Sequence, residues 1–289
     1  MAAWTEIREH GNGKPDTGMF SLEKIIAKSS NVGTALAAYR LWQSEGSKIS
    51  FKWEDFALFR EAVKFGFGSR TGLGDNSGHP GNKESEGHLF FGQQYREKPE
   101  DRKLIIQEYL KSSYGQGIMD VTPIQLITAY SALVNGGTLH KPHIVKSVDG
   151  IEQEYESKSG IISPETSAII RRYMKAVMDY GTGSGSRPEK AAMGGKTGTA
   201  DIPMITSERK GKNGKERRLD SIKGKANLSS FAGFIPYEKP EYMILVMIDE
   251  NRNMASLGKK YHPQGADAAA PVVKKLADAI YEKYMGEGK

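Results

Sequence analysis

The segment that decides the fold and chemistry of this chain is Gly194-Gly195-Lys196-Thr197-Gly198-Thr199-Ala200. We interpret it as a β-strand in which Lys196 places a positive charge beside a groove, while the threonine hydroxyls can bind a carboxylate. Gly198 removes a side chain, so that the backbone of a ligand can lie against the strand edge. The alternative is a solvated lysine on an exposed strand beside a bulge, but the flanking glycines and the second threonine favour a ligand site.

Strand patterns dominate the chain around and after this segment. The predicted strands are Ala191–Ala200, Leu228–Phe234 and Tyr242–Asp249, of which the last is a nearly continuous apolar run typical of a buried strand. An amphipathic helix is predicted over residues 267–284, with inward positions Ala270, Val273, Leu276, Ile280 and Tyr284. Strands followed by a covering helix indicate an α/β chain of the α+β kind, with an antiparallel sheet packed against helices.

The residues before the first predicted strand are mainly helical. Ser21 can cap a helix, and helical spacing of apolar residues resumes at Val32, so Ser29–Asn31 should lie at a helix–helix junction. Thr122 begins a helix with a T-x-x-Q capping box. Further helices are predicted over 52–65, 101–111 and 163–180, and a strand over His140–Val145. We therefore expect one domain, with a loop over 1–20, a mainly helical part over 21–190 and a sheet part over 191–289.

Composition excludes several classes of protein. The chain has 289 residues, a net charge of +6 and no cysteine, so disulfides, thiolate catalysis and cysteine metal sites are excluded. Residues 207–225 hold eight basic and three acidic residues, and the rest of the chain is near neutral, which argues against a nucleic-acid-binding face. We expect this basic stretch to be a mobile loop between two strands. It is either simply solvated or in contact with anionic glycan-peptide or lipid head groups.

A second short motif adds weight to the first. Ser29-Ser30-Asn31 is an S-x-N sequence, which alone is compatible with an ordinary polar turn between helices. Together with the Lys196 segment it matches two of the three motifs of penicillin-binding proteins and class A β-lactamases, which are S-x-x-K, an S-D-N type motif and K-T-G. The chain resembles the transpeptidase domain of class B penicillin-binding proteins, the cell-division and elongation type. The resemblance is carried in family order by Ser21–Gly33, Phe65–Leu73, Tyr114–Tyr130, Asn135–His143, Gly194–Ala200 and Ser230–Asp249.

The first motif is where the chain departs from the family. In the family, S-x-x-K carries the nucleophilic serine and lies several dozen residues before S-x-N, whereas only 28 residues precede Ser29. S-x-x-K strings begin at Ser21, Ser207 and Ser256, and none lies at the expected place. We interpret Ser21 as a helix cap, although it is the one remaining candidate nucleophile. The expectation is a partial transpeptidase domain that lacks the N-terminal strands and the central helix of the fold, so that this fragment alone is inactive.

The resemblance implies a role for each matching residue. An upstream serine attacks the substrate, Ser29 relays a proton and Asn31 holds a substrate amide. Lys196 adds positive charge, Thr197 and Thr199 bind a terminal carboxylate, and Gly198 keeps the strand edge open. It also implies no cofactor and no metal, peptidoglycan stem peptides and β-lactams as ligands, and cell-wall synthesis partners. The expected location is the periplasmic face of the cytoplasmic membrane, with anchor and targeting signal outside these residues.

Other functions share these motifs. A D,D-carboxypeptidase or a β-lactamase differs in whether water can deacylate the serine. A non-enzymatic penicillin-sensing domain and an inactive fragment are further alternatives. The long stretch between the two motifs and the segment Tyr114–Tyr130 favour a transpeptidase.

Overall fold

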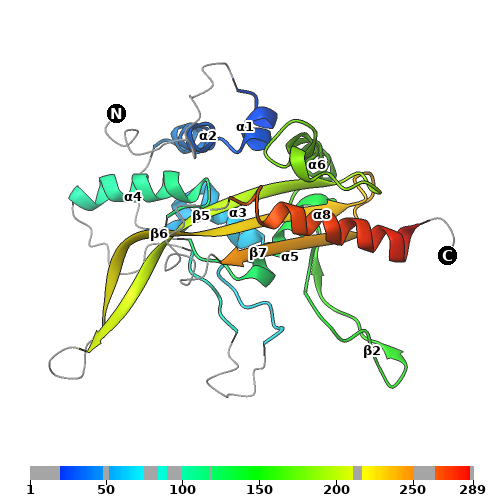
Figure 1. Cartoon of the computed structure of the whole chain (residues 1–289). Coiled ribbons are helices and arrows are strands. Elements are labelled where there is room, and N and C mark those ends of the chain that lie inside the picture. Colours follow the sequence, from blue (N-terminus) through cyan, green and yellow to red (C-terminus); the bar gives the residue numbers. More distant parts are fainter. Residues whose placement is uncertain are drawn as a thin grey trace.

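The computed structural model describes residues 20–47, 52–74, 84–89, 99–117, 119–210, 217–249 and 264–286. Helices pack around one antiparallel sheet, with a long hairpin and a shorter arm extending from the body (Figure 1). No helix in these ranges combines the length and the apolar character needed to cross a membrane. The loop predicted for the first 20 residues lies almost wholly outside the described chain.

The sheet has the strand order β5-β6-β7, and both neighbouring pairs are antiparallel. Its strands are β5 (Gly194–Lys210), β6 (Arg217–Ile235) and β7 (Tyr242–Asp249). The prediction for Tyr242–Asp249 is confirmed, and the turn before it contains a cis Ile235–Pro236 peptide bond.

The prediction of a loop over the basic stretch, residues 207–225, is wrong for most of that stretch. Strands β5 and β6 continue as a paired ladder out to Lys210 and Arg217, past the last residue that pairs with β7 (Figure 1). The many charged residues favoured a loop in the sequence analysis. The hydrogen bonds of a β-ladder, however, require only the backbone groups of two facing strands. Residues 211–216, between the two strands, lie outside the described chain.

Helices cover both faces of the sheet. Helix α8 (Ala269–Ile280), followed by a π-helical turn η4 (Tyr281–Met285), packs on Phe231, Ile235 and Ile244. Helices α5 (Pro123–Val134) and α6 (Pro164–Asp179) pack on Phe234, and a short 3-10 turn η3 (Ser184–Ser186) follows α6. Phe231 and Phe234 serve opposite faces because side chains alternate along a strand.

The predicted inward face of the last helix is partly wrong. Ala270 and Val273 are buried, as expected, but Leu276 is 42% and Tyr284 56% exposed. Ala277 takes the buried position instead, because the stripe that faces the sheet follows residues 270, 273 and 277.

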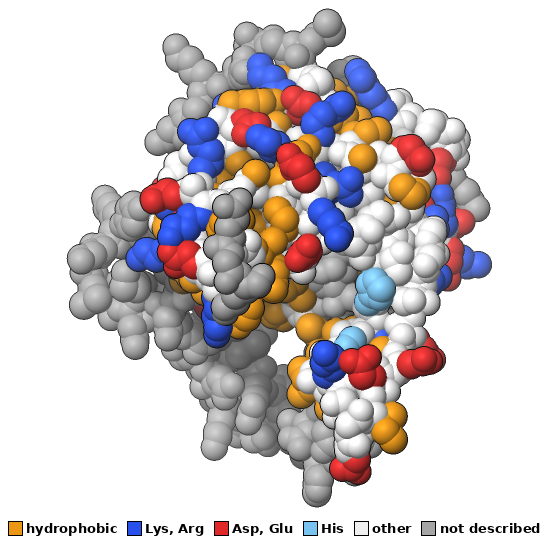
Figure 2. Space-filling model, turned by 90° about the vertical axis from the view of Figure 1, so that its right-hand side faces the viewer, with side chains coloured by type: hydrophobic (Ala, Val, Ile, Leu, Met, Phe, Trp, Pro, Cys, Tyr) orange, Lys and Arg blue, Asp and Glu red, His pale blue; other side chains and the backbone are white. Residues whose placement is uncertain are grey.

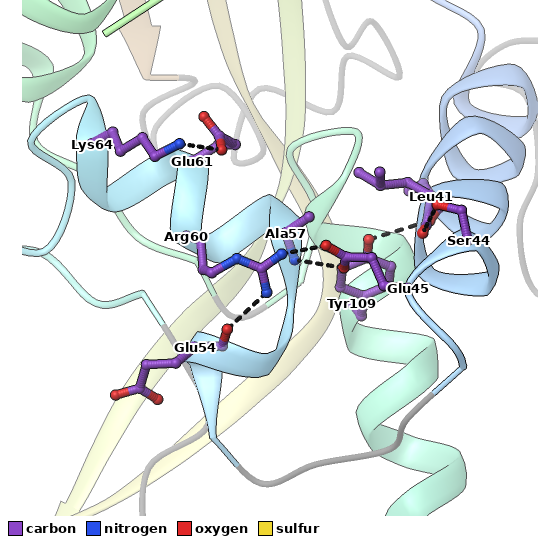
Figure 3. A network of polar contacts seen from close by, with 10 residues as sticks. Leu41, Ser44, Glu45, Glu54, Ala57, Arg60, Glu61, Lys64 and Tyr109 are labelled. Carbon is purple, nitrogen blue, oxygen red and sulfur yellow. Dashed lines mark hydrogen bonds and ion pairs between the residues drawn. The ribbon is translucent and has the colours of Figure 1, made fainter.

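A second core holds the remaining helices together. Helix α2 (Asn31–Ser44) packs with α3 (Ala57–Lys64) and α4 (Pro99–Ser112) around Phe56, Phe59 and Tyr109. A 3-10 turn η2 (Trp53–Asp55) precedes α3. Polar contacts reinforce this core (Figure 3). Glu45, at the end of α2, accepts hydrogen bonds from the Ala57 amide at the start of α3 and from Arg60.

The predicted helix starts are confirmed by their caps. In α1 (Leu22–Lys28) the Ser21 hydroxyl accepts from the Lys24 amide at 3.2 Å. Helix α5 begins with a capping box in which Thr122 and Gln125 satisfy each other's backbone amides. The Ser163 hydroxyl caps α6 by accepting from the Thr166 amide at 3.2 Å.

A small arm extends from the body between α5 and α6. At the base of the arm, β1 (Leu139–His140) pairs with β4 (Ser157–Lys158). At its tip, β2 (Ser147–Val148) pairs with β3 (Ile151–Glu152). Figure 2 shows the arm standing away from the body at the lower right. The strand predicted over His140–Val145 is therefore too long: after Lys141 the chain reaches Pro142, which has no amide to donate to a ladder.

Candidate active site

The two sequence motifs meet across a groove of about 540 Å³. One wall is the junction of α1 and α2 with Ser29 and Asn31, and the other is the start of β5 with Lys196. The lining also includes residues 113–116, Tyr130 of α5, Thr182 after α6, and Gln264 and Ala266 before α8. Residues 167 positions apart in sequence thus face one another, as the two motifs predict.

The backbone at the helix junction presents Ser29 to this groove. Ser29 follows α1 in the left-handed conformation, with φ 54° and ψ 45°, and its amide donates to the Ile26 carbonyl. Ser30 then caps α2 by accepting from the Gly33 amide at 3.0 Å. Asn31 is the first residue of α2 and lines the same groove. A non-glycine residue in this left-handed region costs about 1 kcal/mol or more, so the site holds Ser29 against a local preference.

Lys196 connects the two walls. Its ammonium donates to the Ser29 hydroxyl at 2.6 Å and to the Thr197 carbonyl at 2.9 Å. Burial lowers the pKa of Lys196 from 10.5 to about 8. A lysine with that pKa can give up or take back a proton near neutral pH, and the hydrogen bond provides a direct route to the Ser29 oxygen.

The threonines of the strand are already oriented. The Thr199 hydroxyl accepts from the Gly265 amide at 3.0 Å, so its own proton can be donated to a ligand. The Thr197 hydroxyl lies 2.7 Å from the hydroxyl of Thr182. Both threonines line the groove together with Gly198.

Gly198 has a packing role beside the predicted one. A Cβ atom at Gly198 would meet the Ser230 hydroxyl at 2.4 Å, and one at Gly265 would meet the Gly198 carbonyl at 2.4 Å. The segment before α8 therefore approaches the backbone of β5 closely. This contact brings Gln264 and Ala266 to the groove.

Gln116 and Thr182 are among the groove residues to which the sequence analysis assigned no role. The Gln116 side-chain amide points to the Thr199 carbonyl at 3.4 Å. Gln116 lies in the segment Tyr114–Tyr130 that carries part of the family resemblance. The sequence therefore marked this segment, but the sequence analysis gave Gln116 no role. Thr182 follows a helix end and belongs to no motif. It reaches the groove because Gly181 packs against α1, where a Cβ would lie 2.2 Å from the Ala27 carbonyl.

The S-x-x-K strings do not contribute a serine to this groove within the described residues. The Ser21 hydroxyl is used as the cap of α1, and Ser21 is not among the groove residues. The side chain of Ser207 and all of Ser256 lie outside the described chain. The nucleophile expected from the resemblance is therefore not assigned to any residue here.

Comparison with known proteins agrees with the motifs. The family "Penicillin binding protein transpeptidase domain" matches residues 2–278. The chain is 34% identical over 223 residues to Stage V sporulation protein D of Bacillus subtilis, covering 75% of this chain and 29% of that protein. It is 29% identical over 208 residues to Peptidoglycan D,D-transpeptidase MrdA of Acinetobacter baumannii, covering 69% and 29% respectively. The chain thus spans about three tenths of the length of these relatives.

Solved structures show the same fold. A putative peptidoglycan glycosyltransferase from Atopobium parvulum superposes with a TM-score of 0.68 at 23% identity, covering 96% of this chain and 54% of that one. The transpeptidase domain of Burkholderia pseudomallei penicillin-binding protein 3 gives 0.62 at 23% identity, covering 94% and 67%. The expected α+β transpeptidase-like fold is confirmed. By motif, fold and family match, the chain belongs to the penicillin-binding protein transpeptidase domain family, class B.

Proposed function

We propose that this chain forms the substrate-binding and proton-transfer part of a peptidoglycan D,D-transpeptidase. The observation that carries the proposal is the 2.6 Å hydrogen bond from Lys196 to Ser29 in a groove lined by the K-T-G strand. Membership of the family supports the same reaction class. The ligands are then the D-Ala-D-Ala end of a stem peptide, or a β-lactam, encountered outside the cytoplasm. The anchor and the cell-wall synthesis partners belong to the longer protein.

The reaction requires a nucleophilic serine, which we assign to an S-x-x-K segment outside these 289 residues. The lysine of that segment takes the proton of the serine, the serine oxygen forms an ester with the penultimate D-Ala carbonyl, and the peptide bond to the terminal D-Ala breaks. Ser29 passes a proton to the departing amine and is reprotonated by Lys196. An amine from a second stem peptide then displaces the serine and forms the cross-link. Because Lys196 has a pKa of about 8, most of it carries the proton at neutral pH.

Binding of the substrate falls to the strand and the helix junction. Thr197 and Thr199 hold the terminal carboxylate, and the Thr199 hydroxyl is oriented for this by the bond from Gly265. Asn31 holds a substrate amide. The backbone amide of Thr199 supplies half of the oxyanion hole, a group whose loss typically costs about 3–4 kcal/mol of barrier. The nucleophilic serine supplies the other half.

The test is acylation by a fluorescent penicillin, measured on the chain joined to the S-x-x-K segment of a class B relative. Lys196→Ala should slow acylation about 100-fold or more, because a preorganised electrostatic group is lost. Lys210→Ala, at the far end of the same strand, should leave the rate unchanged. Equal rates for the two variants would remove the assignment of Lys196.

The chain alone provides a second measurement. We expect no covalent label without the added segment, because none of the described groove serines follows the S-x-x-K pattern. Peptide mapping of a stable adduct to Ser21 would instead make Ser21–Lys24 the first motif. Adding an amine acceptor separates a transpeptidase from a carboxypeptidase or β-lactamase, since only the former gives a cross-linked product.

A further inference from the structure

A second groove lies on the described part of the chain, and it shares no lining residue with the Lys196 groove. Its volume is about 800 Å³, larger than that of the first. It is bounded by the turn after α3 (residues 65–72), by Gln125 and Thr128 of α5, and by the β1–β4 base of the arm. A cavity of this size holds a ligand of several residues rather than a single small ion.

The wall formed by residues 69–72 is rigidly held. The Glu84 carboxylate accepts from the Thr71 amide at 2.8 Å, the Thr71 hydroxyl at 2.5 Å and the Gly72 amide at 2.8 Å. The fully buried Gln125 side chain donates to the Ser69 carbonyl at 2.8 Å. Since Glu84 already uses these backbone amides, a ligand in the groove must be recognised by side chains. A wall fixed before binding lowers the entropy cost of association.

The side chains of the groove give it a positive charge. Arg70, Lys141 and Lys158 line it, against one carboxylate, Glu156. None of the described carboxylates lies within ion-pair distance of Lys141 or Lys158, and Arg70 reaches Glu86 only at 3.9 Å. Like charges gathered around one hollow repel each other, and an anionic ligand would relieve that repulsion.

An apolar floor accompanies the charge. Phe65, Leu139 and Pro142 line the groove and are each partly buried. Leu139 pairs directly with Lys158 across the β1–β4 ladder, so apolar and cationic side chains are adjacent. A free phosphate would match the cations and leave this apolar surface uncovered. An extended peptide with both carboxylates and apolar side chains would match both features.

We propose that this groove binds an acidic peptide, with carboxylates at Lys141 and Lys158 and apolar side chains over Leu139 and Phe65. The inference is independent of the acyl-transfer reaction, because the two grooves share no residue. Binding weakens as salt is added, since the cations are solvent-exposed.

Fluorescence polarisation of the 289-residue chain tests this, with a short fluorescein-labelled peptide of alternating glutamate and leucine as the probe. The Lys141→Glu/Lys158→Glu double variant should bind about tenfold more weakly than the unchanged chain, since two favourable charge contacts become repulsive. The matched control is Lys146→Glu, on the same arm but outside the groove, which should bind as the unchanged chain does. Equal losses in the two variants would overturn the proposal.

A variant that strengthens binding excludes misfolding as the explanation. Glu156→Lys removes the one opposing carboxylate and should tighten binding several-fold. The counterpart peptide with glutamine in place of glutamate should bind at least about tenfold more weakly. Equal binding of the two peptides, or displacement of the probe by inorganic phosphate at similar concentration, would show that the groove does not recognise an acidic peptide.

Discussion

Ser29 shows a conflict between local backbone preference and chemistry. Its left-handed conformation, with φ 54°, is one that glycine adopts without strain and serine does not. The hydroxyl is nevertheless held 2.6 Å from the Lys196 ammonium. A residue kept in a costly conformation at a groove is typical of a functional position.

This conflict predicts an unusual order of stabilities. The free energy of unfolding of Ser29→Gly should be about 1 kcal/mol higher than that of Ser29→Ala, because only glycine relieves the backbone strain. Both variants lose the hydroxyl to which Lys196 donates, and in the chain joined to an S-x-x-K segment both should lose acylation equally. Urea denaturation of the pair measures the difference. At Ser131, inside helix α5, the order should reverse, since glycine is the poorer residue there by about 1 kcal/mol. Equal stabilities of the two Ser29 variants would contradict the strain.

The buried charge of Lys196 predicts a pH dependence of stability. Burial lowers its pKa from 10.5 to about 8, so between these values the unfolded chain keeps a proton that the folded chain releases. The unfolded state then binds more protons, and the free energy of unfolding contributed by Lys196 rises with pH across this window. Below about pH 8 the lysine is charged in both states, and the full cost of burying the charge remains.

The measurement is urea unfolding between about pH 7 and about pH 9.5, for the unchanged chain and for Lys196→Met. The unchanged chain should gain stability relative to Lys196→Met as the pH rises, because the variant has no group to deprotonate. Burial also raises the pKa of Tyr109 to about 12, which acts in the opposite direction above pH 10. Both proteins share Tyr109, so the subtraction removes its effect. A pH-independent difference would contradict the lowered pKa.

At the level of helices, the carboxylate of Glu45 joins α2 to α3 (Figure 3). It accepts from Arg60 and from the Ala57 amide, which lies at the N-terminal end of α3, where a negative charge is favourable. Arg60 also donates to the Glu54 carbonyl at 2.8 Å. The contact places the start of α3 against the Tyr109 core.

Glu45→Ala should therefore lower the free energy of unfolding by about 1–2 kcal/mol, because two donors lose a charged acceptor. Glu61→Ala is the matched control. Its side chain is half exposed, and among the described residues it forms an ion pair only with Lys64 of α3, so its loss should cost about 0.5 kcal/mol or less. Chemical denaturation measures both, and equal effects would show that Glu45 does not connect the helices.

The molecule as a whole divides into a packed body and two extensions. Among the residues whose side chains the structure describes, the buried residues of β6 lie between Asn227 and Ile235, and the β5–β6 ladder continues beyond the region that pairs with β7. The outer ladder has no third strand among the described residues, so its removal leaves the region in which all three strands pair intact.

Deleting residues 208–219 joins Ser207 to Asp220, which already face each other in the ladder. The melting temperature should change by less than about 3 °C, whereas Phe234→Ala should cost about 3–5 kcal/mol. Binding to anionic vesicles or to glycan-peptide polymer, measured across salt, should also be unchanged if the basic stretch is only solvated. Loss of binding on deletion would show that the stretch contacts anionic partners.

Several features of this protein follow from local sequence alone. The caps at Ser21, Thr122 and Ser163 and the strand Tyr242–Asp249 were predictable because each depends on residues close in sequence. The K-T-G and S-x-N motifs identified the family and the candidate site residues because the chemistry constrains their residue types.

Contacts between distant segments decided the rest. The length of β5 and β6 depends on backbone pairing between two strands, which their charged side chains do not reveal. Gln116 and Thr182 join the groove only because separate elements approach β5, and the lowered pKa of Lys196 arises from burial that no local pattern encodes. Local rules set the elements of this protein, whereas packing of residues far apart in sequence, with the desolvation that it causes, set the site.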